Sequence, residues 1–360
     1  MTPPPAVFAT CRAGFEREAA TDLLRALGSS ASEFEVEPGS GHVTGSVPSL
    51  SAGALRRFLA APAIFARNTC LGTGPWTLVS ERSASHRDRV TPLMGAIETL
   101  GAHAPHSPPW RSVWVEFPDT NEGKQRSSLA RALEGRLAGA LDASGRLDPT
   151  APSRLHVLLA DERSAFVGTS DAAATLWPLG IPRIARSRAA PSRSAQKLAE
   201  AFVVFLGSRE AESIRAGQRA VDLGAAPGGW SWLLAQRGLR VTAVDNGPLK
   251  GEVASDPLVT HVRADGLAFR PRRPVDWLTC DIVEQPIRIA ELVAGWIADG
   301  AARQAIFNLK LPMKKRYDEV LRCDERLAAR LAGAGTRARW RLRQLYHDRE
   351  EVTGYLRRDD

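Results

Sequence analysis

Apolar positions in the second half of the chain switch repeatedly between a strand-like period of two and a helix-like period of about 3.6 residues. The strand-like runs predict strands over Ala220–Leu223, Arg240–Val244, Thr260–Arg263, Val275–Thr279, Gln304–Leu309, Ala338–Leu345 and Val352–Arg357. The helix-like runs predict helices over Ser194–Leu206, Gly229–Gln236, Ile287–Ala298 and Tyr317–Ala334. Strands that alternate with helices in this way are typical of a mostly parallel sheet covered on both faces.

The first half shows no such alternation. Its pattern predicts strands over Ala6–Arg12, Glu33–Glu37, Gly41–Val47, Arg111–Phe117, Arg154–Ala160 and Ala165–Thr169. Helices are predicted over Phe15–Leu27, Ser49–Leu59 and Ser127–Leu141. An irregular stretch rich in proline and arginine, from Thr175 to Ser194, predicts a domain boundary. The first half is therefore expected to be a separate α+β region.

The composition is that of a soluble globular protein. Apolar residues make up 44% and charged residues 24% of the 360 residues, a length that suggests two or three domains. The four cysteines include no C-x-x-C pair, which indicates reduced thiols, and the histidine spacing predicts no metal site. The sequence shows no signal peptide, and its apolar runs are far shorter than the ~20 residues of a membrane helix. These features indicate a cytoplasmic protein.

Positive charge is unevenly divided between the two halves. Residues 1–187 carry 19 basic and 18 acidic side chains, whereas residues 188–360 carry 29 and 22, within a net charge of +8. The second half is therefore the better candidate for contact with a polyanion, although solubility alone explains the same excess. Only six of the 48 basic residues are lysines. An ammonium can lose its proton where a guanidinium cannot, so each lysine is a candidate for acid–base chemistry.

The strongest local motif links a predicted strand to a predicted helix. Its sequence is Val221-Asp-Leu-Gly-Ala-Ala-Pro-Gly-Gly-Trp230, and such glycines let a ligand approach the backbone and the free N–H groups of a helix N-terminus. Asp245 ends the next strand, 23 residues after Asp222, about where an acidic residue meets a ribose hydroxyl in nucleotide-binding folds. Pro227 has no N–H, and the pattern differs from the dinucleotide G-x-G-x-x-G. The motif thus predicts a nucleotide-type ligand without a pyrophosphate cradle.

This motif resembles the S-adenosylmethionine-binding motif of the 2'-O-ribose RNA methyltransferases. Other blocks continue this resemblance. The last two blocks of the second half and the blocks of the first half resemble specifically the RlmM family, the 23S rRNA cytidine-2'-O-methyltransferases with an N-terminal THUMP region. In the second half the blocks are Pro191-Ser-Arg-Ser-Ala-Gln-Lys-Leu, Cys280-Asp-Ile-Val-Glu-Gln-Pro, Phe307-Asn-Leu-Lys-Leu-Pro-Met-Lys-Lys and Leu345-Tyr-His-Asp-Arg-Glu-Glu-Val-Thr. In the first half they are Cys11-Arg-Ala-Gly-Phe-Glu-Arg-Glu, Ile64-Phe-Ala-Arg, Asp119-Thr-Asn-Glu and Gly168-Thr-Ser. The resemblance covers nearly the whole chain.

The resemblance implies an α/β fold with a Rossmann-like, S-adenosylmethionine-dependent methyltransferase domain built on a mostly parallel seven-stranded sheet. An α+β ferredoxin-like/THUMP region precedes it. The implied domains are a ferredoxin-like part over residues 1–50, a THUMP RNA-binding domain over 51–170, a linker over 171–190 and the methyltransferase domain over 191–360. The implied cofactor is S-adenosyl-L-methionine, the implied partner is 23S rRNA with its target cytidine in the peptidyl-transferase region, and the implied state is a monomer.

In the wider class of ribose methyltransferases a Lys-Asp-Lys-Glu tetrad surrounds the target hydroxyl, and the resemblance places it at Lys197, Asp281, Lys310 and Glu351. A ribose 2'-OH is a poor nucleophile that must lose its proton as it attacks the methyl sulfonium, so a base with a lowered pKa suits the reaction. The resemblance makes Lys310 that base. Lys197 is expected to disfavour the charged form of Lys310, while the two carboxylates orient the pair and balance its charge. Taken singly, each of the four also fits an ordinary surface charge or a helix cap.

The cofactor-binding residues that the resemblance implies follow predicted strands or open a predicted helix: Ser194, Ala226, Pro227, Gly228, Gly229, Asp245, Asp265 and Asp281. The four residues of the glycine-rich turn line the methionine end of the cofactor. Asp245 binds its ribose hydroxyls and Asp265 faces its adenine. Without the resemblance, Asp265 is more simply interpreted as a turn residue.

Two other functions stay open at this point. One is a 2'-O-methyltransferase that acts on tRNA, since THUMP regions are common in tRNA-modifying enzymes. The other is a non-catalytic RNA-binding factor in ribosome assembly, and the complete set of two lysines and two carboxylates argues against it. The run Lys314-Lys315-Arg316, directly after the predicted catalytic strand, is either a clamp for substrate phosphates or a solvated face.

Overall fold

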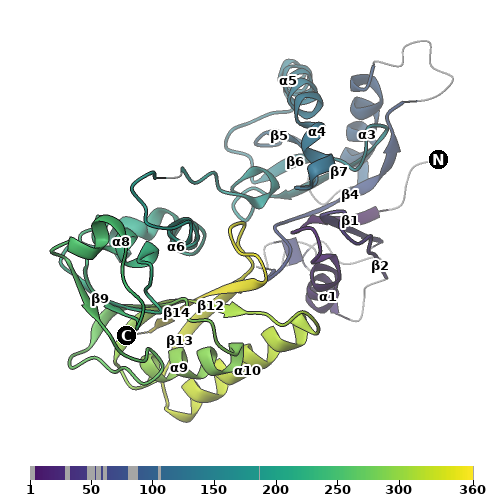
Figure 1. The fold of residues 1–360 in the computed structure, drawn as a ribbon. Coiled ribbons are helices and arrows are strands. Elements are labelled where there is room, and N and C mark those ends of the chain that lie inside the picture. Colours follow the sequence, from purple (N-terminus) through teal and green to yellow (C-terminus); the bar gives the residue numbers. More distant parts are fainter. Residues whose placement is uncertain are drawn as a thin grey trace. The chain divides into compact units, whose positions relative to one another are not determined.

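The computed structural model describes residues 5–28, 33–46, 53, 58–59, 63–79, 88–103, 107–185 and 187–359. The chain divides into two compact units, residues 1–181 and 182–360, and each is described by itself here (Figure 1). The division falls inside the segment 171–190, the predicted linker. The helix predicted over Ser49–Leu59 lies mostly outside the described residues.

The first unit is built on a seven-stranded mixed sheet with the order β2-β3-β1-β4-β7-β6-β5. Its strands are β1 (Pro5–Thr10), β2 (Phe34–Glu35), β3 (His42–Ser46), β4 (Asn68–Thr77), β5 (Val113–Glu116), β6 (Ser153–Leu159) and β7 (Ser164–Asp171). Only β5 and β6 pair in parallel among these seven strands. One sheet therefore runs through both 1–50 and 51–170, and the division of this unit at residue 50 stays a prediction.

Four α-helices and one short 3-10 helix accompany this sheet in the described part of the first unit: α1 (Glu16–Leu27), α3 (Val90–His103), α4 (Asn121–Gln125), α5 (Ser127–Ala143) and η2 (Pro178–Gly180). A buried cluster packs α3 and α5 on the sheet through Leu93, Ile97, Leu137 and Leu141. The predicted α+β character of the first half agrees with this arrangement.

The sequence pattern does not predict β4 or α3. β4 contains two glycines and a proline, which normally weaken a strand. In the fold, Gly72 of β4 pairs with Gly168 of β7, and a Cβ atom added to Gly72 would lie 2.0 Å from the Val167 carbonyl oxygen. The two backbones come so close that only glycine fits, and this long-range requirement has no local signature.

The first unit also buries a cluster of polar side chains, which we call the Glu116–His156 cluster. His156 Nδ1 lies 2.6 Å from Glu116 Oε2, and His156 Nε2 lies 2.8 Å from Ser170 Oγ. The other Glu116 oxygen accepts hydrogen bonds from Asn68 Nδ2 (3.3 Å) and from the Leu179 backbone N–H. The Glu116 and His156 side chains are 3% and 0% exposed, so the cluster fastens η2 to the sheet in a closed interior.

The second unit has a seven-stranded sheet with the order β10-β9-β8-β11-β12-β14-β13. Its strands are β8 (Arg219–Leu223), β9 (Arg240–Val244), β10 (Val259–Val262), β11 (Val275–Cys280), β12 (Ala302–Lys310), β13 (Ala338–Arg343) and β14 (Glu351–Arg358). The first five strands in this order, β10, β9, β8, β11 and β12, are parallel, and β14 runs antiparallel to both of its neighbours. This confirms the predicted mostly parallel seven-stranded sheet.

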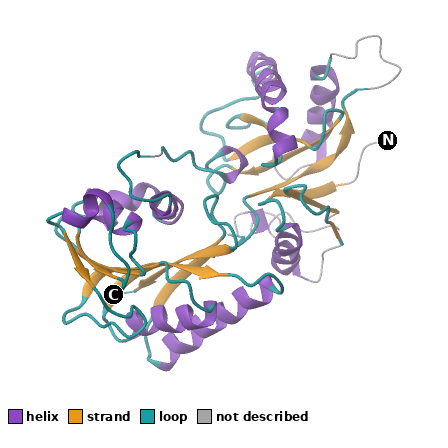
Figure 2. Cartoon of the chain, in the orientation of Figure 1, coloured by secondary structure: helices purple, strands orange, loops and turns teal. Residues whose placement is uncertain are grey.

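Helices cover both faces of this sheet: α6 (Ser194–Phe205), α8 (Gly229–Gln236), α9 (Pro286–Ala298) and α10 (Arg316–Gly333). Figure 2 shows α6 and α8 on one side of the strands, and α9 and α10 on the other. The short segments η3 (Gly207–Arg209), α7 (Glu210–Ser213) and η4 (Gly251–Ser255) lie between the main elements.

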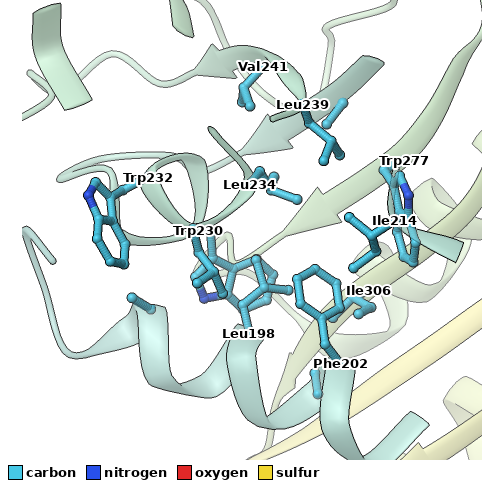
Figure 3. Packing of buried hydrophobic residues seen from close by; sticks show 14 of the residues in the cluster. Leu198, Phe202, Ile214, Trp230, Trp232, Leu234, Leu239, Val241, Trp277 and Ile306 are labelled. Carbon is cyan, nitrogen blue, oxygen red and sulfur yellow. The ribbon is translucent and has the colours of Figure 1, made fainter. Parts of the chain in front are cut away.

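One core cluster of the second unit lies beneath α6 and α8. Leu198 and Phe202 of α6 meet Trp230 and Leu234 of α8 above Trp277 of β11 (Figure 3). α8 is buried from Gly229 to Ala235, as expected for a helix that is apolar on nearly all sides. This packing fixes the start of α8, and with it the glycine-rich turn, against the start of α6.

Candidate active site

The candidate residues gather at one edge of the second sheet. Parallel strands end at the same edge, so the turn after β8, Asp245 after β9, Asp281 after β11 and Lys310 at the end of β12 come together there. β14 runs the other way and begins at this edge, where Glu351 pairs directly with Lys310 in the strand register. The fold thus joins groups that lie far apart in the sequence.

The four tetrad residues form one linked set. Lys310 Nζ donates to Asp281 Oδ1 and to Glu351 Oε2. Lys197 Nζ, from α6, donates to the other Glu351 oxygen, Oε1. The side chains are 10% to 22% exposed, so the set is sheltered and still reachable from solvent.

The charge state of Lys310 differs from the expectation. Burial disfavours its ammonium, but the charges and hydrogen bonds of Asp281 and Glu351 outweigh burial and raise the pKa of Lys310 above its ordinary value. Lys197 donates to the other oxygen of the same Glu351 carboxylate, so the two lysines share this anion. The expectation that Lys310 has a lowered pKa is therefore wrong.

Glu351 is the negative centre of the set. Burial raises the pKa of this carboxyl group, but Lys310 and Lys197 outweigh that effect and hold the pKa below its usual range. Glu351 therefore stays ionised at neutral pH and bridges the two lysines.

Several polar residues that sequence reasoning missed support the tetrad from behind. Asn308 Nδ2 donates to Asp281 Oδ1 (2.9 Å), and Thr353 Oγ1 donates to Asn308 Oδ1 (2.8 Å). Asp348 lies behind Thr353 and is fully buried; burial, followed by the negative charge of Glu351, raises its pKa well above the ordinary value. The signal in the sequence is Asn308, a polar residue within the apolar run of β12.

Glu200, one turn after Lys197 on α6, holds the loop that precedes Glu351. It is 1% exposed and accepts hydrogen bonds from the Tyr346 N–H (2.7 Å), the His347 N–H (2.9 Å) and His347 Nδ1 (2.6 Å). This contact fixes α6 to the start of β14, so Lys197 and Glu351 stay within reach of each other.

The glycine-rich turn sits beside the tetrad on the same edge. Gly228 has a φ of +112° and begins α8 without a side-chain cap, so the first N–H groups of the helix face outward for a ligand. A Cβ atom on Gly229 would lie 2.4 Å from Ser194 Oγ, and Trp230 Nε1 donates to the Ser194 carbonyl oxygen (2.9 Å). Ser194 therefore lies directly against the turn.

Asp245 holds the other side of the turn. Its two carboxylate oxygens accept hydrogen bonds from the Ala226 N–H (3.0 Å) and the Gly247 N–H (2.7 Å). Asp265 is exposed and accepts a hydrogen bond from the Leu267 N–H (2.9 Å), so in this structure it closes its own turn.

Asp222, inside the motif, is fully buried below the turn. It accepts hydrogen bonds from Ser231 Oγ (2.6 Å) and Thr279 Oγ1 (2.9 Å), and these fasten α8 and β11 to β8. Burial outweighs these bonds and raises the pKa of Asp222 to about 7.

The described residues contain neither a candidate metal site nor a candidate membrane span. No group of three or more His, Cys, Asp or Glu side chains in the described part of the chain is arranged to hold a metal ion. No helix among the described residues is long and apolar enough to cross a membrane.

The sheet order, the glycine-rich turn after its first strand and the charged edge define a class of protein. Residues 190–308 match the family of FtsJ-like methyltransferases. The chain therefore carries a methyltransferase domain with the Rossmann-like fold that uses S-adenosylmethionine in this class.

Full-length relatives narrow the class. The chain is 46% identical over 364 residues to "Ribosomal RNA large subunit methyltransferase M" of Methylococcus capsulatus, with 99% of each chain covered. Proteins of the same name from Azoarcus sp. and Laribacter hongkongensis are 45% and 48% identical, and the matches cover 97% and 78% of this chain and 95% and 78% of theirs. Residues 88–171 match the N-terminal domain of that family. The chain belongs to the ribosomal RNA large subunit methyltransferase M family.

Proposed function

We propose that this protein transfers a methyl group from S-adenosylmethionine to the ribose 2'-OH of a cytidine in 23S rRNA. The observation that carries the proposal is the linked set of Asp281, Lys310, Glu351 and Lys197 beside the glycine-rich turn. A set of two lysines and two carboxylates has no use in methyl transfer to an already basic nitrogen, but it suits a hydroxyl that must lose a proton.

The residues present fit the cofactor. The turn offers the uncapped N-terminus of α8 to the carboxylate of the methionine end, because N–H groups at a helix start attract anions. Asp245, at the end of the neighbouring strand, is positioned for the two ribose hydroxyls, and the exposed Asp265 for the adenine. Ser194, Ala226, Pro227, Gly229 and Asp281 complete the proposed contacts. The cofactor supplies an electrophilic methyl group on a sulfonium.

Lys310 is the proposed proton acceptor. Its Nζ is held by two carboxylates, which fix its position and keep it charged in the free protein. It becomes a base only where the ammonium is disfavoured. The positive sulfonium nearby and the exclusion of water by bound RNA both act in that direction. Glu351 and Lys197 then hold the amine in line with the target hydroxyl.

The rim of the site carries groups suited to a nucleoside. Val283, two residues after Asp281, is 87% exposed, and Met313, three residues after Lys310, is 77% exposed. Exposed apolar side chains at a charged rim indicate contact with a ligand, here the base of the target cytidine. Lys314 and Lys315 are exposed beside Met313 and are placed to contact phosphates.

The first unit is proposed to select the RNA as a THUMP-type domain. Residues 1–181 carry 17 basic and 18 acidic side chains, so bulk charge does not attract RNA to this unit, and it would recognise shape or a few nucleotides. The relatives are named for ribosomal RNA, which favours rRNA over tRNA as the substrate. A cytoplasmic monomer without metal completes the proposal.

Mapping of 2'-O-methyl groups on total RNA tests the proposal. A strain that lacks this gene should lose one 2'-O-methylcytidine from 23S rRNA, and expression of the wild-type chain should restore it. Expression of the Lys310→Arg variant should not. Loss of a 2'-O-methyl group from tRNA instead would move the substrate to tRNA, and unchanged RNA would refute the enzymatic function.

A further inference from the structure

A second cluster of positive charge lies at the opposite edge of the methyltransferase sheet. A surface pocket there, which we call the distal arginine pocket, is lined by the side chains of Arg209, Arg215, Arg303, Arg357 and Arg358 together with Glu212 and Asp276. Five cations against two anions give the pocket a net charge of +3.

The fold brings these arginines together from separate segments. Arg303 lies near the start of β12, Arg357 and Arg358 lie at the end of β14, and Arg215 precedes β8. Strands β12 and β14 are antiparallel, and Gln304 pairs with Arg357. Lys310 lies seven residues after Arg303 along the extended strand β12, which places the pocket about 23 Å from the tetrad.

Most of these arginines lack internal counter-ions. Among the described residues, Arg209, Arg215, Arg357 and Arg358 form no salt bridge, whereas most arginines of α10 do. Asp276, one of the two acidic groups, already accepts a hydrogen bond from the Arg219 N–H (2.9 Å). Charge crowding is visible next to the pocket at Arg341, whose pKa is lowered first by burial and then by the positive charge of Arg209.

We infer that the distal arginine pocket binds phosphate groups of the RNA backbone, at a site separate from the target nucleotide. Guanidinium groups match phosphate oxygens in paired hydrogen bonds, and convergent arginines, four of which form no salt bridge among the described residues, are the chemistry that recognises such anions. This inference rests on the proposed function, which supplies a large polyanion as substrate. The ribosomal RNA would then contact two opposite edges of the catalytic unit.

The two sites predict different dependence on RNA length. A short hairpin around the target cytidine reaches the tetrad but cannot also reach a pocket about 23 Å away on the opposite edge. A full-length rRNA transcript can reach both. Arginines of the distal pocket should therefore matter for the long RNA alone.

The test uses the full-length Arg215→Gln/Arg358→Gln variant, in which both exchanged side chains are exposed. Its affinity for full-length 23S rRNA transcript should fall roughly tenfold, and the slope of log affinity against log salt should drop by about two, one for each phosphate contact. Affinity for S-adenosylmethionine and methylation of the short hairpin should stay unchanged. The Arg215→Lys/Arg358→Lys variant keeps the charge and should restore most of the salt slope.

The matched control is Arg322→Gln/Arg326→Gln on α10, which removes the same charge from arginines that pair with Glu319 and Glu291. An equal loss of affinity in this control, or an unchanged salt slope in the pocket variant, would overturn the inference. Both readouts are binding measurements, so they do not depend on catalysis. Failure of the wild-type protein to methylate any RNA would instead count against the proposed function.

Discussion

Each unit holds a basic side chain against carboxylates: His156 against Glu116 in the first unit, and Lys310 against Asp281 and Glu351 in the second. The comparison shows how a closed cluster differs from an accessible one. In the first unit Glu116 and His156 are 3% and 0% exposed, and their polar atoms bond to Ser170, Asn68 and the Leu179 N–H. In the second unit the tetrad side chains remain 10% to 22% exposed. The first cluster is closed around protein partners, and the second is open to a ligand.

The difference follows from where each cluster lies on its sheet. Glu116 and His156 lie on the adjacent strands β5 and β6, where His156 pairs with Trp114 and its ring reaches Glu116 two residues further along β5. The segment η2 covers them through the Leu179 N–H. Lys310 and Asp281 lie at strand ends, where parallel strands leave an edge that loops do not cover. Ion pairing alone therefore does not distinguish the two clusters, whereas exposure at the carboxyl edge of the sheet does.

The largest effect is expected from Lys310→Arg, which keeps the charge of the open cluster but cannot release a proton. Methyl transfer should fall by about 10²–10⁴-fold, the range of general-base catalysis, while S-adenosylmethionine affinity and the melting temperature stay near wild type. Single-turnover methylation and calorimetry measure these quantities. Lys124→Arg, at a lysine paired with Asp119 in the first unit, is the matched control and should be silent.

The raised pKa of Lys310 gives the same experiment a pH dependence. The base must be uncharged, and its pKa in the free protein is above the ordinary lysine value, so kcat/KM should rise about tenfold per pH unit through neutral pH without a plateau. A plateau near pH 7 would assign the proton to a different group.

Glu116→Ala should lower the stability of the protein and leave methyl transfer unchanged, whereas Lys310→Arg should do the reverse. Glu116→Ala leaves the donors of Asn68 and Leu179 and the His156 ring without their acceptor in a closed interior, so the free energy of unfolding should fall by about 3 kcal/mol. Single-turnover chemistry in the folded fraction should be unchanged. Glu122→Ala, on the exposed face of α4, is the control for loss of one carboxylate. A loss of chemistry at full stability would break the distinction between the two clusters.

Asp245→Ala should weaken binding of the cofactor and should not affect proton removal from the target hydroxyl. Loss of the proposed hydrogen bonds from the cofactor ribose to this carboxylate should weaken S-adenosylmethionine binding by about 1–3 kcal/mol in calorimetry. The exposed Glu252 in η4 offers a control, Glu252→Ala. Unchanged affinity would mean that the ribose of the cofactor is held elsewhere.

The smallest effect is expected at Asp222, a fully buried carboxylate of the second unit. Its folded-state pKa of about 7 lies above the ~3.9 of an unfolded aspartate, so the folded state binds more protons between these values and loses stability as the pH rises through that window. From pH 5.5 to 7, wild type should lose about 1–2 kcal/mol relative to Asp222→Asn. Parallel unfolding curves for the two proteins would place the Asp222 pKa at an ordinary value.

Local motifs predicted the second unit better than the first. The predicted bounds of α8 and β9 coincide with those in the fold, because a strand, a glycine-rich turn and a helix follow one another within 26 residues, from Arg219 to Val244. The sequence pattern did not predict β4, because Gly72 is needed for close packing against a strand that lies almost 100 residues further along the chain.

The same limit applies to the candidate site. A resemblance of short motifs selected all four tetrad residues, but the bond between Lys310 and Glu351 depends on the register of β12 and β14. The motifs assigned no role to Asn308, Asp348 or Glu200, because these residues contact other side chains and backbone groups that support the tetrad. The predicted direction of the Lys310 pKa shift was wrong for the same reason, since that direction depends on which carboxylates the fold places beside the ammonium.

The most direct test of the account is the identity of the methylated nucleoside. Purified protein, unmodified 23S rRNA transcript and S-adenosylmethionine are incubated, and the RNA is digested to nucleosides and analysed by mass spectrometry. The open cluster around Lys310 predicts 2'-O-methylcytidine from wild type and none from Lys310→Arg. A cytidine methylated on its base, or equal product from the Lys310→Arg variant, would contradict it.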